Sequence, residues 1–451
     1  MAVTLAQPPG RTDLRPSAQL PPLMEKLVIE GGVPLSGTIV PAGNKNAALP
    51  LLACSLLTEE RVVLHNVPKI RDTEAMLSLL AGLGVRVERL DGNSVALQAD
   101  RVANTEVAPE LAERIRASFL VAGPLLARFG SALMPPPGGD VIGRRRLDPH
   151  LDAFRALGAI VEERRDIRLH APNGGLQACD FFMDEPSVMG TENALMAAAL
   201  TNGSTVIRNA ASEPHVQDLA RMLNRMGAAI EGIGSNVMYV HGVGKLGGCE
   251  HSVSPDHIEI ASFMALAGVT GGELRIRDCV TDDLRMIRLV FKRLGLHTDL
   301  DGEDVIVPGD QRLVMQRDSG GYAAKIEDGP WPAFPADLTS IALALATQSE
   351  GTVLIFEKMF ENRLIFTDKL VFMGANIILC DPHRAVISGP TRLRGERVES
   401  PDIRAGMAML IAALCAEGVS EIGNVIQIDR GYERIDERLR GLGARIDRQV
   451  A

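Results

Sequence analysis

The feature that most constrains the fold of this 451-residue chain is a pair of residues that returns six times. A leucine or methionine followed by glycine ends a helical pattern, and alternating apolar and polar residues follow at once. Successive glycines of these pairs are 74, 69, 68, 79 and 69 residues apart. They are Gly84, Gly158, Gly227, Gly295, Gly374 and Gly443. Glycine here is typical of a helix end that leads into a strand, so the chain is predicted to contain six β/α repeats.

Each repeat contains a second helical stretch, upstream of the first, in which nearly every residue is apolar or small. A helix without a polar face is predicted to be buried. These stretches are residues 45–60, 116–130, 191–203, 259–272, 337–351 and 404–418. Units of this size are small for independent folding, so we expect two lobes of three repeats with the ligand site between them. The repeats alone also allow a scaffold that only binds.

The expected division of the chain follows from this grouping. Residues 1–22 are rich in proline and are predicted to be a disordered tail, while residues 45–254 form one lobe. The second lobe is expected to combine residues 23–44 with residues 255–451.

Composition narrows the class of protein. The chain is 46% apolar and 23% charged, as soluble globular proteins are, and only 4% aromatic, so its core must be aliphatic. Its longest apolar run, Met407–Ala416, is half of a membrane span. The six scattered cysteines indicate reduced, buried, cytoplasmic thiols without a metal site or disulfide framework. A net charge of −10 argues against nucleic-acid binding, so an anionic substrate needs a local cationic cluster.

The starts of the six buried stretches supply candidates for that cluster. Aligning the stretches near their ends, on Glu59, Gly130, Gly203, Gly271, Gly351 and Gly418, and stepping back fourteen positions selects one residue in each repeat. These are Lys45, Arg116, Met189, His257, Asp337 and Arg404. A cation is unfavourable beside the partial positive charge of a helix N-terminus, unless both serve to bind an anion. A single one can be a solvated charge with an acidic partner, but three at one repeat position favour a phosphate or carboxylate site.

Eight segments in order carry a family resemblance from about Glu25 to the C-terminus. They are GNKNAALPLLACSLLTEE, RASFLVAGPLLARFG, PPGGDVIGRRRLDPH, PSVMGTEN, FPAD, FENR, SPDIRAG and QIDRGYER. Together they resemble the UDP-N-acetylglucosamine enolpyruvyltransferases, and the 5-enolpyruvylshikimate-3-phosphate synthases in fold only. The resemblance implies an α/β protein, a two-lobed inside-out α/β barrel with three β/α units per lobe. It also implies that the lobes close over phosphoenolpyruvate and an acceptor, without a metal or other cofactor.

The implied reaction is an addition followed by an elimination. Carbon 3 of phosphoenolpyruvate is protonated, the acceptor hydroxyl attacks carbon 2, and phosphate leaves. The resemblance assigns Lys45 and Asn46 to phosphoenolpyruvate, Arg145 and Arg430 to its phosphate, and Arg363 and Arg404 to its carboxylate. An arginine fork suits both groups. Each arginine could instead form an ordinary ion pair, and for Arg430 the candidate partners are Asp429 and Glu433.

Two carboxylates complete the expected catalytic set with Lys45. Asp337 matches the family's carboxylate beside the acceptor hydroxyl and is expected to be its base, although it could also cap a helix. Asp140 stands where most members have cysteine, in a glycine-rich loop that is either a plain turn or a lid over residues 135–146. Fosfomycin carries an epoxide, and a carboxylate attacks an epoxide poorly. The enzyme is therefore expected to be insensitive to this drug, and so resistant to it.

The acceptor contacts also follow from the resemblance. They are Arg116, Arg145, Arg146, Leu147, Asp148, Pro149, His150, Glu185, Pro186, Ser187, Val188, Met189, Asp337 and Met359. Met189 replaces a glycine and could narrow the sugar pocket.

UDP-N-acetylglucosamine, acting at its 3-hydroxyl in peptidoglycan synthesis, is the expected acceptor, and UMP or another uridine nucleotide in specialised metabolism is the alternative. A silent binding paralogue is a third possibility, although every expected charged group is present. No nucleic-acid or membrane partner is expected, and the chain is predicted to be a monomer or weak homo-oligomer.

Overall fold

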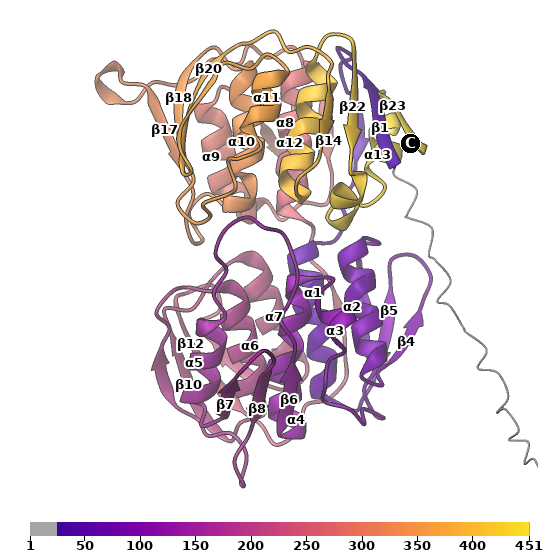
Figure 1. Ribbon diagram of the computed structural model, residues 1–451, viewed down its shortest axis with the longest axis vertical. Helices are drawn as coiled ribbons and strands as arrows, with labels where there is room; N and C mark the ends of the chain where they lie inside the picture. Colours follow the sequence, from indigo (N-terminus) through magenta and orange to yellow (C-terminus); the bar gives the residue numbers. More distant parts are fainter. Residues whose placement is uncertain (1–24, 451) are drawn as a thin grey trace, which may run out of the picture.

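The computed structural model describes residues 25–450 and arranges them as two lobes, one above the other in Figure 1. The predicted tail, residues 1–22, lies outside the described residues. Each lobe is an inside-out α/β barrel, in which three buried helices are surrounded by sheets and outer helices. None of the helices between residues 25 and 450 has both the length and the apolar character of a membrane span.

The first lobe is built around α1, α4 and α6 (Figure 1). Its helices are α1 (Lys45–Cys54), α2 (Arg71–Gly82), α3 (Pro109–Ala112), α4 (Ala122–Phe129), α5 (Asp148–Ala156), α6 (Val188–Ala199) and α7 (Pro214–Arg225), with 3-10 turns η1 (Ser55–Leu57) and η2 (Arg116–Val121). Its strands are β3 (Val62–His65), β4 (Arg86–Arg89), β5 (Val95–Gln98), β6 (Ser131–Met134), β7 (Ile160–Glu163), β8 (Ile167–His170), β9 (Asp180–Phe182), β10 (Gly203–Arg208), β11 (Ala229–Glu231), β12 (Val237–Gly242) and β13 (Cys249–Ser252).

The second lobe repeats this plan around α8, α10 and α12. Its helices are α8 (His257–Thr270), α9 (Arg285–Arg293), α10 (Thr339–Gln348), α11 (Thr367–Phe372), α12 (Ile403–Cys415) and α13 (Ile435–Gly441), with 3-10 turns η3 (Thr281–Leu284), η4 (Ser319–Gly321), η5 (Ala336–Leu338) and η6 (Val425–Arg430). Its strands are β1 (Glu25–Glu30), β2 (Gly37–Ile39), β14 (Leu274–Ile276), β15 (Asp299–Asp301), β16 (Asp304–Val307), β17 (Ala324–Glu327), β18 (Gly351–Phe356), β19 (Ile377–Asp381), β20 (Arg384–Gly389), β21 (Arg397–Glu399), β22 (Val419–Gly423) and β23 (Arg445–Val450).

Sheet pairing shows how the chain passes between the lobes. In most repeats a buried helix joins two parallel strands, as α10 joins β17 to β18 and α12 joins β21 to β22. Two strands are exchanged: β2 precedes α1 but pairs with β14, and β13 precedes α8 but pairs with β3. Two neighbouring chain segments therefore connect the lobes, and the amide of Asn44 donates a hydrogen bond of 2.7 Å to the carbonyl of Ser254 where they meet.

The six repeat glycines have the predicted conformation. Their φ angles lie between 87° and 107°, in the left-handed region that disfavours side chains. At each of them a helix ends and the chain turns toward a strand, as at Gly227 between α7 and β11. The repeat prediction is therefore confirmed at every unit.

The stretch predicted as one buried helix over residues 116–130 is instead broken into η2 and α4. The carboxamide of Asn193 donates to the carbonyl of Phe119 at 3.0 Å and accepts from the amide of Gly123 at 2.8 Å. Those two backbone groups would bond to each other in a continuous α-helix. Gly123 is required here, since a Cβ atom would lie 2.6 Å from the carbonyl oxygen of Asn193.

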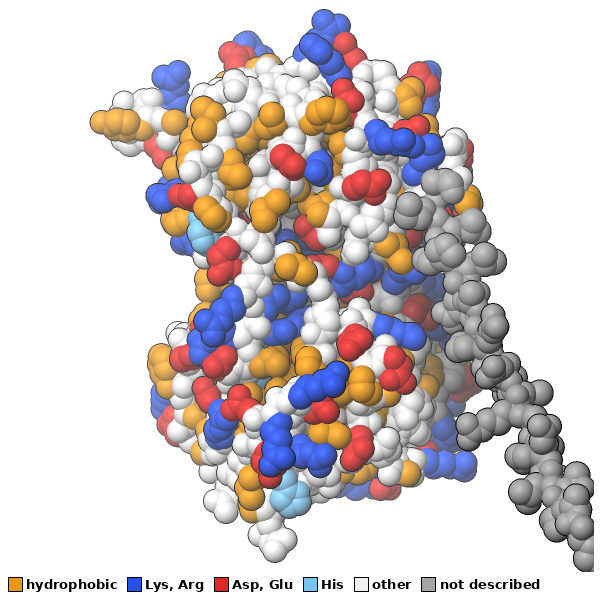
Figure 2. All heavy atoms as spheres, viewed as in Figure 1, with side chains coloured by type: hydrophobic (Ala, Val, Ile, Leu, Met, Phe, Trp, Pro, Cys, Tyr) orange, Lys and Arg blue, Asp and Glu red, His pale blue; other side chains and the backbone are white. Residues whose placement is uncertain are grey.

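The buried helices place their N-terminal ends toward the junction of the lobes. The core of one lobe contains buried residues from Ala47 to Val253, and the other core joins Leu27–Ile39 to Ile258–Ile446. In Figure 2 lysine and arginine side chains gather along the groove between the lobes. The fold therefore directs six helix starts at one place.

Candidate active site

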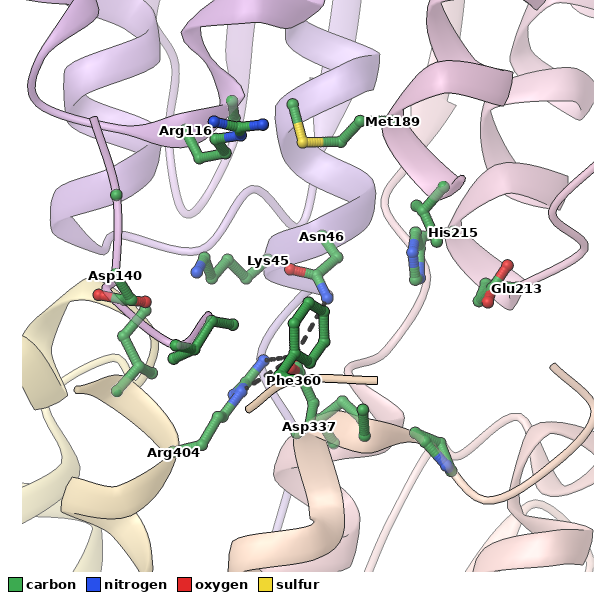
Figure 3. A pocket seen from close by; sticks show the side chains of 18 of the residues that line it. Lys45, Asn46, Arg116, Asp140, Met189, Glu213, His215, Asp337, Phe360 and Arg404 are labelled. Carbon is green, nitrogen blue, oxygen red and sulfur yellow. Dashed lines mark hydrogen bonds and ion pairs between the residues drawn. The ribbon is translucent and has the colours of Figure 1, made fainter. Parts of the chain in front are cut away.

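Six residues at the starts of the buried helices line a single cavity of about 260 Å³ between the lobes. They are Lys45 at α1, Arg116 at η2, Met189 at α6, His257 at α8, Asp337 in η5 and Arg404 at α12. Lys45, Arg116, Met189, Asp337 and Arg404 surround the same space in Figure 3. Because backbone N–H groups at these helix starts add partial positive charge, the arrangement suits an anionic ligand.

One cluster of charges joins three parts of the chain around Asp72. The ammonium nitrogen of Lys45 lies 3.0 Å from the Asp72 carboxylate, and Nε of Arg430 lies 2.9 Å from it. Arg430 also pairs with Asp140. Burial alone would raise the pKa of the Asp72 carboxyl, but the charges of Lys45 and Arg430 outweigh it and lower the pKa. The cluster therefore keeps two cations beside the cavity.

The cluster around Asp72 decides between the alternatives for Arg430. Asp429 pairs with Arg448 at 2.8 Å, and Glu433 accepts from the amide of Lys69 at 2.9 Å. Neither is the partner of Arg430, so the repeat-internal ion pair considered from the sequence is wrong.

A second cluster surrounds Asp337. Its carboxylate accepts hydrogen bonds from Nη2 of Arg363 at 3.0 Å and from Nη2 and Nε of Arg404 at 2.9 and 3.1 Å. Burial alone would raise the pKa of Asp337, but the charges of Arg404, Arg363 and Lys45 hold it far below the ordinary carboxyl value. Asp337 makes no capping bond to α10, so the helix-cap role considered from the sequence is wrong.

Two arginines of the first lobe lie at the base of the loop that carries Asp140. Arg145 lines the cavity and forms no salt bridge with any residue from 25 to 450. Arg116 donates to the backbone carbonyls of Arg145 and Arg146 at 2.6 and 3.2 Å. Burial and the charge of Arg145 lower the pKa of Arg116 to about 10, which leaves it protonated at neutral pH.

The loop from residue 135 to 146 contains no helix or strand and contacts the second lobe. The carboxylate of Glu361 accepts from the amide of Arg144 at 3.1 Å, and the carbonyl of Ile142 accepts from the amide of Asn362 at 3.0 Å. A Cβ atom on Gly143 would lie 2.1 Å from that carboxylate, so glycine permits the approach. The loop therefore covers the cavity and joins the two lobes.

The expected site residues divide into two groups by position. Those that line the cavity are Lys45, Asn46, Arg116, Asp140, Arg145, Val188, Met189, Asp337, Met359, Arg363, Arg404 and Arg430. Those that do not line it are Arg146, Leu147, Asp148, Pro149, His150, Glu185, Pro186 and Ser187. Arg146 instead pairs with Asp148 and Asp184. His150 is buried, and its Nδ1 lies 2.8 Å from the side-chain amide nitrogen of Asn193. The acceptor roles of the second group stay predictions.

Several residues of the cavity were not selected from the sequence. They are Asp72, Glu192, Glu213, His215, Trp331, Phe360 and Asp402. Asp72 had no local signal, because an acidic residue in the first turn of a helix is ordinary and its partner Arg430 is 358 residues away. Glu192 did have a local signal in the sequence, since it is an ionisable residue within a mostly apolar stretch.

The described chain offers little for metal or thiol chemistry. All six cysteines are free, and no three His, Cys, Asp or Glu side chains from residue 25 to 450 are grouped to hold a metal. The expectation that all six thiols are buried is wrong for Cys380, which is exposed on β19, and only partly true of three others. None lines the cavity.

The geometry described above is that of an anion-binding cleft between two inside-out α/β lobes. The EPSP synthase (3-phosphoshikimate 1-carboxyvinyltransferase) family model matches residues 29–439, and the chain belongs to this family of enolpyruvyl transferases.

Within this family, two proteins of similar sequence carry a more specific name. The UDP-N-acetylglucosamine 1-carboxyvinyltransferase of Bradyrhizobium diazoefficiens is 56% identical, with 93% of this chain and 97% of that protein aligned. The protein of the same name from Treponema denticola is 53% identical, with 94% and 99% aligned.

Solved structures agree with the fold. The enolpyruvyl transferase NikO from Streptomyces tendae superposes with a TM-score of 0.84 at 23% identity, over 95% of this chain and all of that one. EPSP synthase from Acinetobacter baumannii gives 0.72 at 17% identity, over 94% and 100%. At these identities the likeness shows the fold alone.

Proposed function

We propose that this chain transfers the enolpyruvyl group of phosphoenolpyruvate to the 3-hydroxyl of UDP-N-acetylglucosamine and releases phosphate. One observation carries the proposal: cations from both lobes and the carboxylates Asp140 and Asp337 line one cavity. The names of the relatives at 53–56% identity support the choice of acceptor. We assign the reaction to peptidoglycan synthesis in the cytoplasm.

The phosphate is held by Lys45, Arg145 and Arg430 in this proposal. Two of these cations, Lys45 and Arg430, pair with Asp72, and Asp140 supplies a second negative charge at Arg430. Arg145 has no such partner among the described residues and offers a free guanidinium fork. As phosphate arrives it takes the place of Asp140 on Arg430, and the released carboxyl is then able to carry the proton that carbon 3 receives.

The acceptor hydroxyl is placed beside Asp337. Asp337 takes the proton of this hydroxyl as the oxygen attacks carbon 2, and Arg363 and Arg404 hold the carboxylate of phosphoenolpyruvate. Asn46 lies 3.5 Å from Asp337 and helps to orient it. Carbon 3 then loses a proton, the bond to phosphate breaks, and the enol ether is formed. A low pKa keeps Asp337 ionised but makes it a weak base, so the arginines must turn from Asp337 to the substrate carboxylate before it acts.

The two lobes of this proposal are residues 45–254 and residues 23–44 with 255–451, closed by the loop over 135–146. Closure excludes water from the intermediate, which would otherwise be exposed to hydrolysis.

The test is phosphate release from phosphoenolpyruvate with UDP-N-acetylglucosamine, UMP, UDP or shikimate 3-phosphate offered separately. We expect release only with the first. Release with UMP or shikimate 3-phosphate, and none with UDP-N-acetylglucosamine, would reject the proposed acceptor while keeping the reaction type.

A further inference from the structure

The cavity has two chemically different ends. Figure 3 shows Lys45 and Asp140 on one side, and His215 and Glu213 on the other, with Asn46 between them. The first end holds the cations already described. The second end also includes Glu192, which lies one turn after Met189 on α6, so both residues face the cavity.

Three polar atoms at this second end have no hydrogen-bond partner among the described residues. They are Oε1 of Glu192, Oε2 of Glu213 and Nδ1 of His215. Glu192 is 1% exposed and His215 is 7% exposed. A buried polar atom without a partner destabilises the fold, and a native protein rarely keeps three of them together. A ligand with matching polar groups would explain their presence.

The neighbours of these groups fix their chemistry. Burial, and then the charge of Glu213, raise the pKa of Glu192 well above its ordinary value. Burial and His257 lower the pKa of His215 to about 3. Burial therefore favours the uncharged form of Glu192 and of His215, and in that form each can donate and accept a hydrogen bond. A hydroxyl group also donates and accepts, so it can pair with both functions of such groups, whereas an anionic substituent can use only their donors.

We propose that Glu192, Glu213 and His215 form a subsite that hydrogen-bonds the 4-hydroxyl of the acceptor's sugar ring. The inference rests on the proposed function, in which the 3-hydroxyl lies beside Asp337. The 4-hydroxyl is next to the reacting one, and carbon 4 lies across the ring from carbon 1, which carries the nucleotide. In the proposed orientation of the sugar, it extends past Asn46 toward the second end of the cavity, away from Lys45.

The test is a comparison of kcat/KM for UDP-N-acetylglucosamine and for its 4-epimer, UDP-N-acetylgalactosamine. A site built to hydrogen-bond a hydroxyl rejects an analogue that lacks it, because its own polar groups stay unpaired. We expect the protein to prefer the first substrate at least tenfold. In Glu192→Leu and His215→Leu the preference should fall below about threefold. Glu231→Gln alters an exposed carboxylate on β11 and should keep the full preference.

Each result separates the two proposals. Turnover of UDP-N-acetylglucosamine with an equal rate for the 4-epimer in the unaltered protein overturns the subsite and leaves the proposed function standing. Full preference in both leucine variants also overturns it. Absence of turnover with any UDP-sugar overturns both. Because the first comparison uses the unaltered protein, the inference is tested even where a leucine variant does not fold. A thermal midpoint at or above that of the unaltered protein would support Glu192 as a binding residue, since removing an unpaired buried carboxyl stabilises the fold.

Discussion

Two carboxylates of the cavity, Asp72 and Asp337, each hold two cations, but they differ in which parts of the chain they join. Asp72 of the first lobe pairs with Lys45 of its own lobe and with Arg430 of the other, which also reaches Asp140 in the covering loop. Asp337 pairs with Arg363 and Arg404, and all three belong to the second lobe. One cluster therefore requires both lobes and the loop, and the other is complete within one lobe.

This difference separates closure from chemistry. The Asp72 cluster can form only when the lobes and the loop come together, so its contacts report closure. The ion pairs of the Asp337 cluster lie within the second lobe, so they do not depend on contact between the lobes. Substitutions in the two clusters should therefore impair the protein in different ways.

Asp337→Asn should cause the largest loss. The amide oxygen can still accept from one of the two arginines, but the amide cannot accept the hydroxyl proton, and general base catalysis is worth about 10²–10⁴-fold. We expect turnover to fall by that factor while the Kd for UDP-N-acetylglucosamine, measured by calorimetry, changes little. More than a tenth of the original activity would remove Asp337 from the role of base.

Lys45→Ala and Arg430→Ala should each lower kcat/KM at least a hundredfold without unfolding the protein. Removing one member of a desolvated cation–anion contact costs several kcal/mol, so about 3–5 kcal/mol is expected at the phosphate, which is a hundredfold or more. Circular dichroism serves as the folding control. A near-normal rate in either variant would show that the residue does not bind the phosphate. It would also weaken the proposed link between closure and anion binding.

Asp72→Asn should have an intermediate effect, with turnover reduced about tenfold, because Lys45 and Arg430 stay but are less well aligned. Thermal stability should also fall, since a buried carboxylate between two cations is lost. The folded pKa of Asp72 is lowered, so its stabilising effect is present above the unfolded value of about 3.9 and is lost as pH falls through the folded value.

The difference in thermal midpoint between the unaltered protein and Asp72→Asn should therefore be full at pH 7 and shrink in acid. Glu417→Gln, which breaks an exposed pair with Arg392, is the matched control and should change neither activity nor midpoint appreciably. A difference that grows as the pH falls would contradict the assigned ion pairs.

The repeats and the helix starts could be predicted because they are local patterns. The φ angle of Gly227 and the cavity position of Arg404 follow from a helix period, a helix end and a count along the chain. The position of a residue within its repeat also selected His257, which lines the cavity although no role had been assigned to it. Such features are present in each unit separately and do not depend on how the units pack.

What the sequence did not predict depends on contacts between distant units. Arg430, one of the two partners of Asp72, is 358 residues away from it, and the broken helix at Gly123 results from the side chain of Asn193 in another repeat. The unpaired atoms of Glu192 on α6 and His215 on α7 can be found only once the packing of these helices is known. Local patterns carry no information on which side chains from separate repeats will share a cavity.

The smallest change in turnover is expected for Asp140→Cys, which also tests the covering loop most directly. An epoxide phosphonate such as fosfomycin resembles phosphoenolpyruvate, so Lys45, Arg145 and Arg430 should attract it. To bind, its phosphonate must displace Asp140 from Arg430, and Asp140 is then a poor nucleophile toward the epoxide. The unaltered protein is therefore expected to keep its activity after prolonged exposure.

In Asp140→Cys a thiol takes the place of this carboxylate, close to the Arg430 guanidinium, whose positive charge favours the thiolate. We expect the variant to turn over within about tenfold of the unaltered protein, since a thiol can also deliver a proton. It should lose activity with time in the drug and gain a single mass adduct on residue 140. The native cysteines lie outside the cavity, so an adduct on exposed Cys380 should leave activity intact. Time-dependent inactivation of the unaltered protein, with the adduct on another residue, would show that Asp140 does not lie beside the reacting carbons of phosphoenolpyruvate.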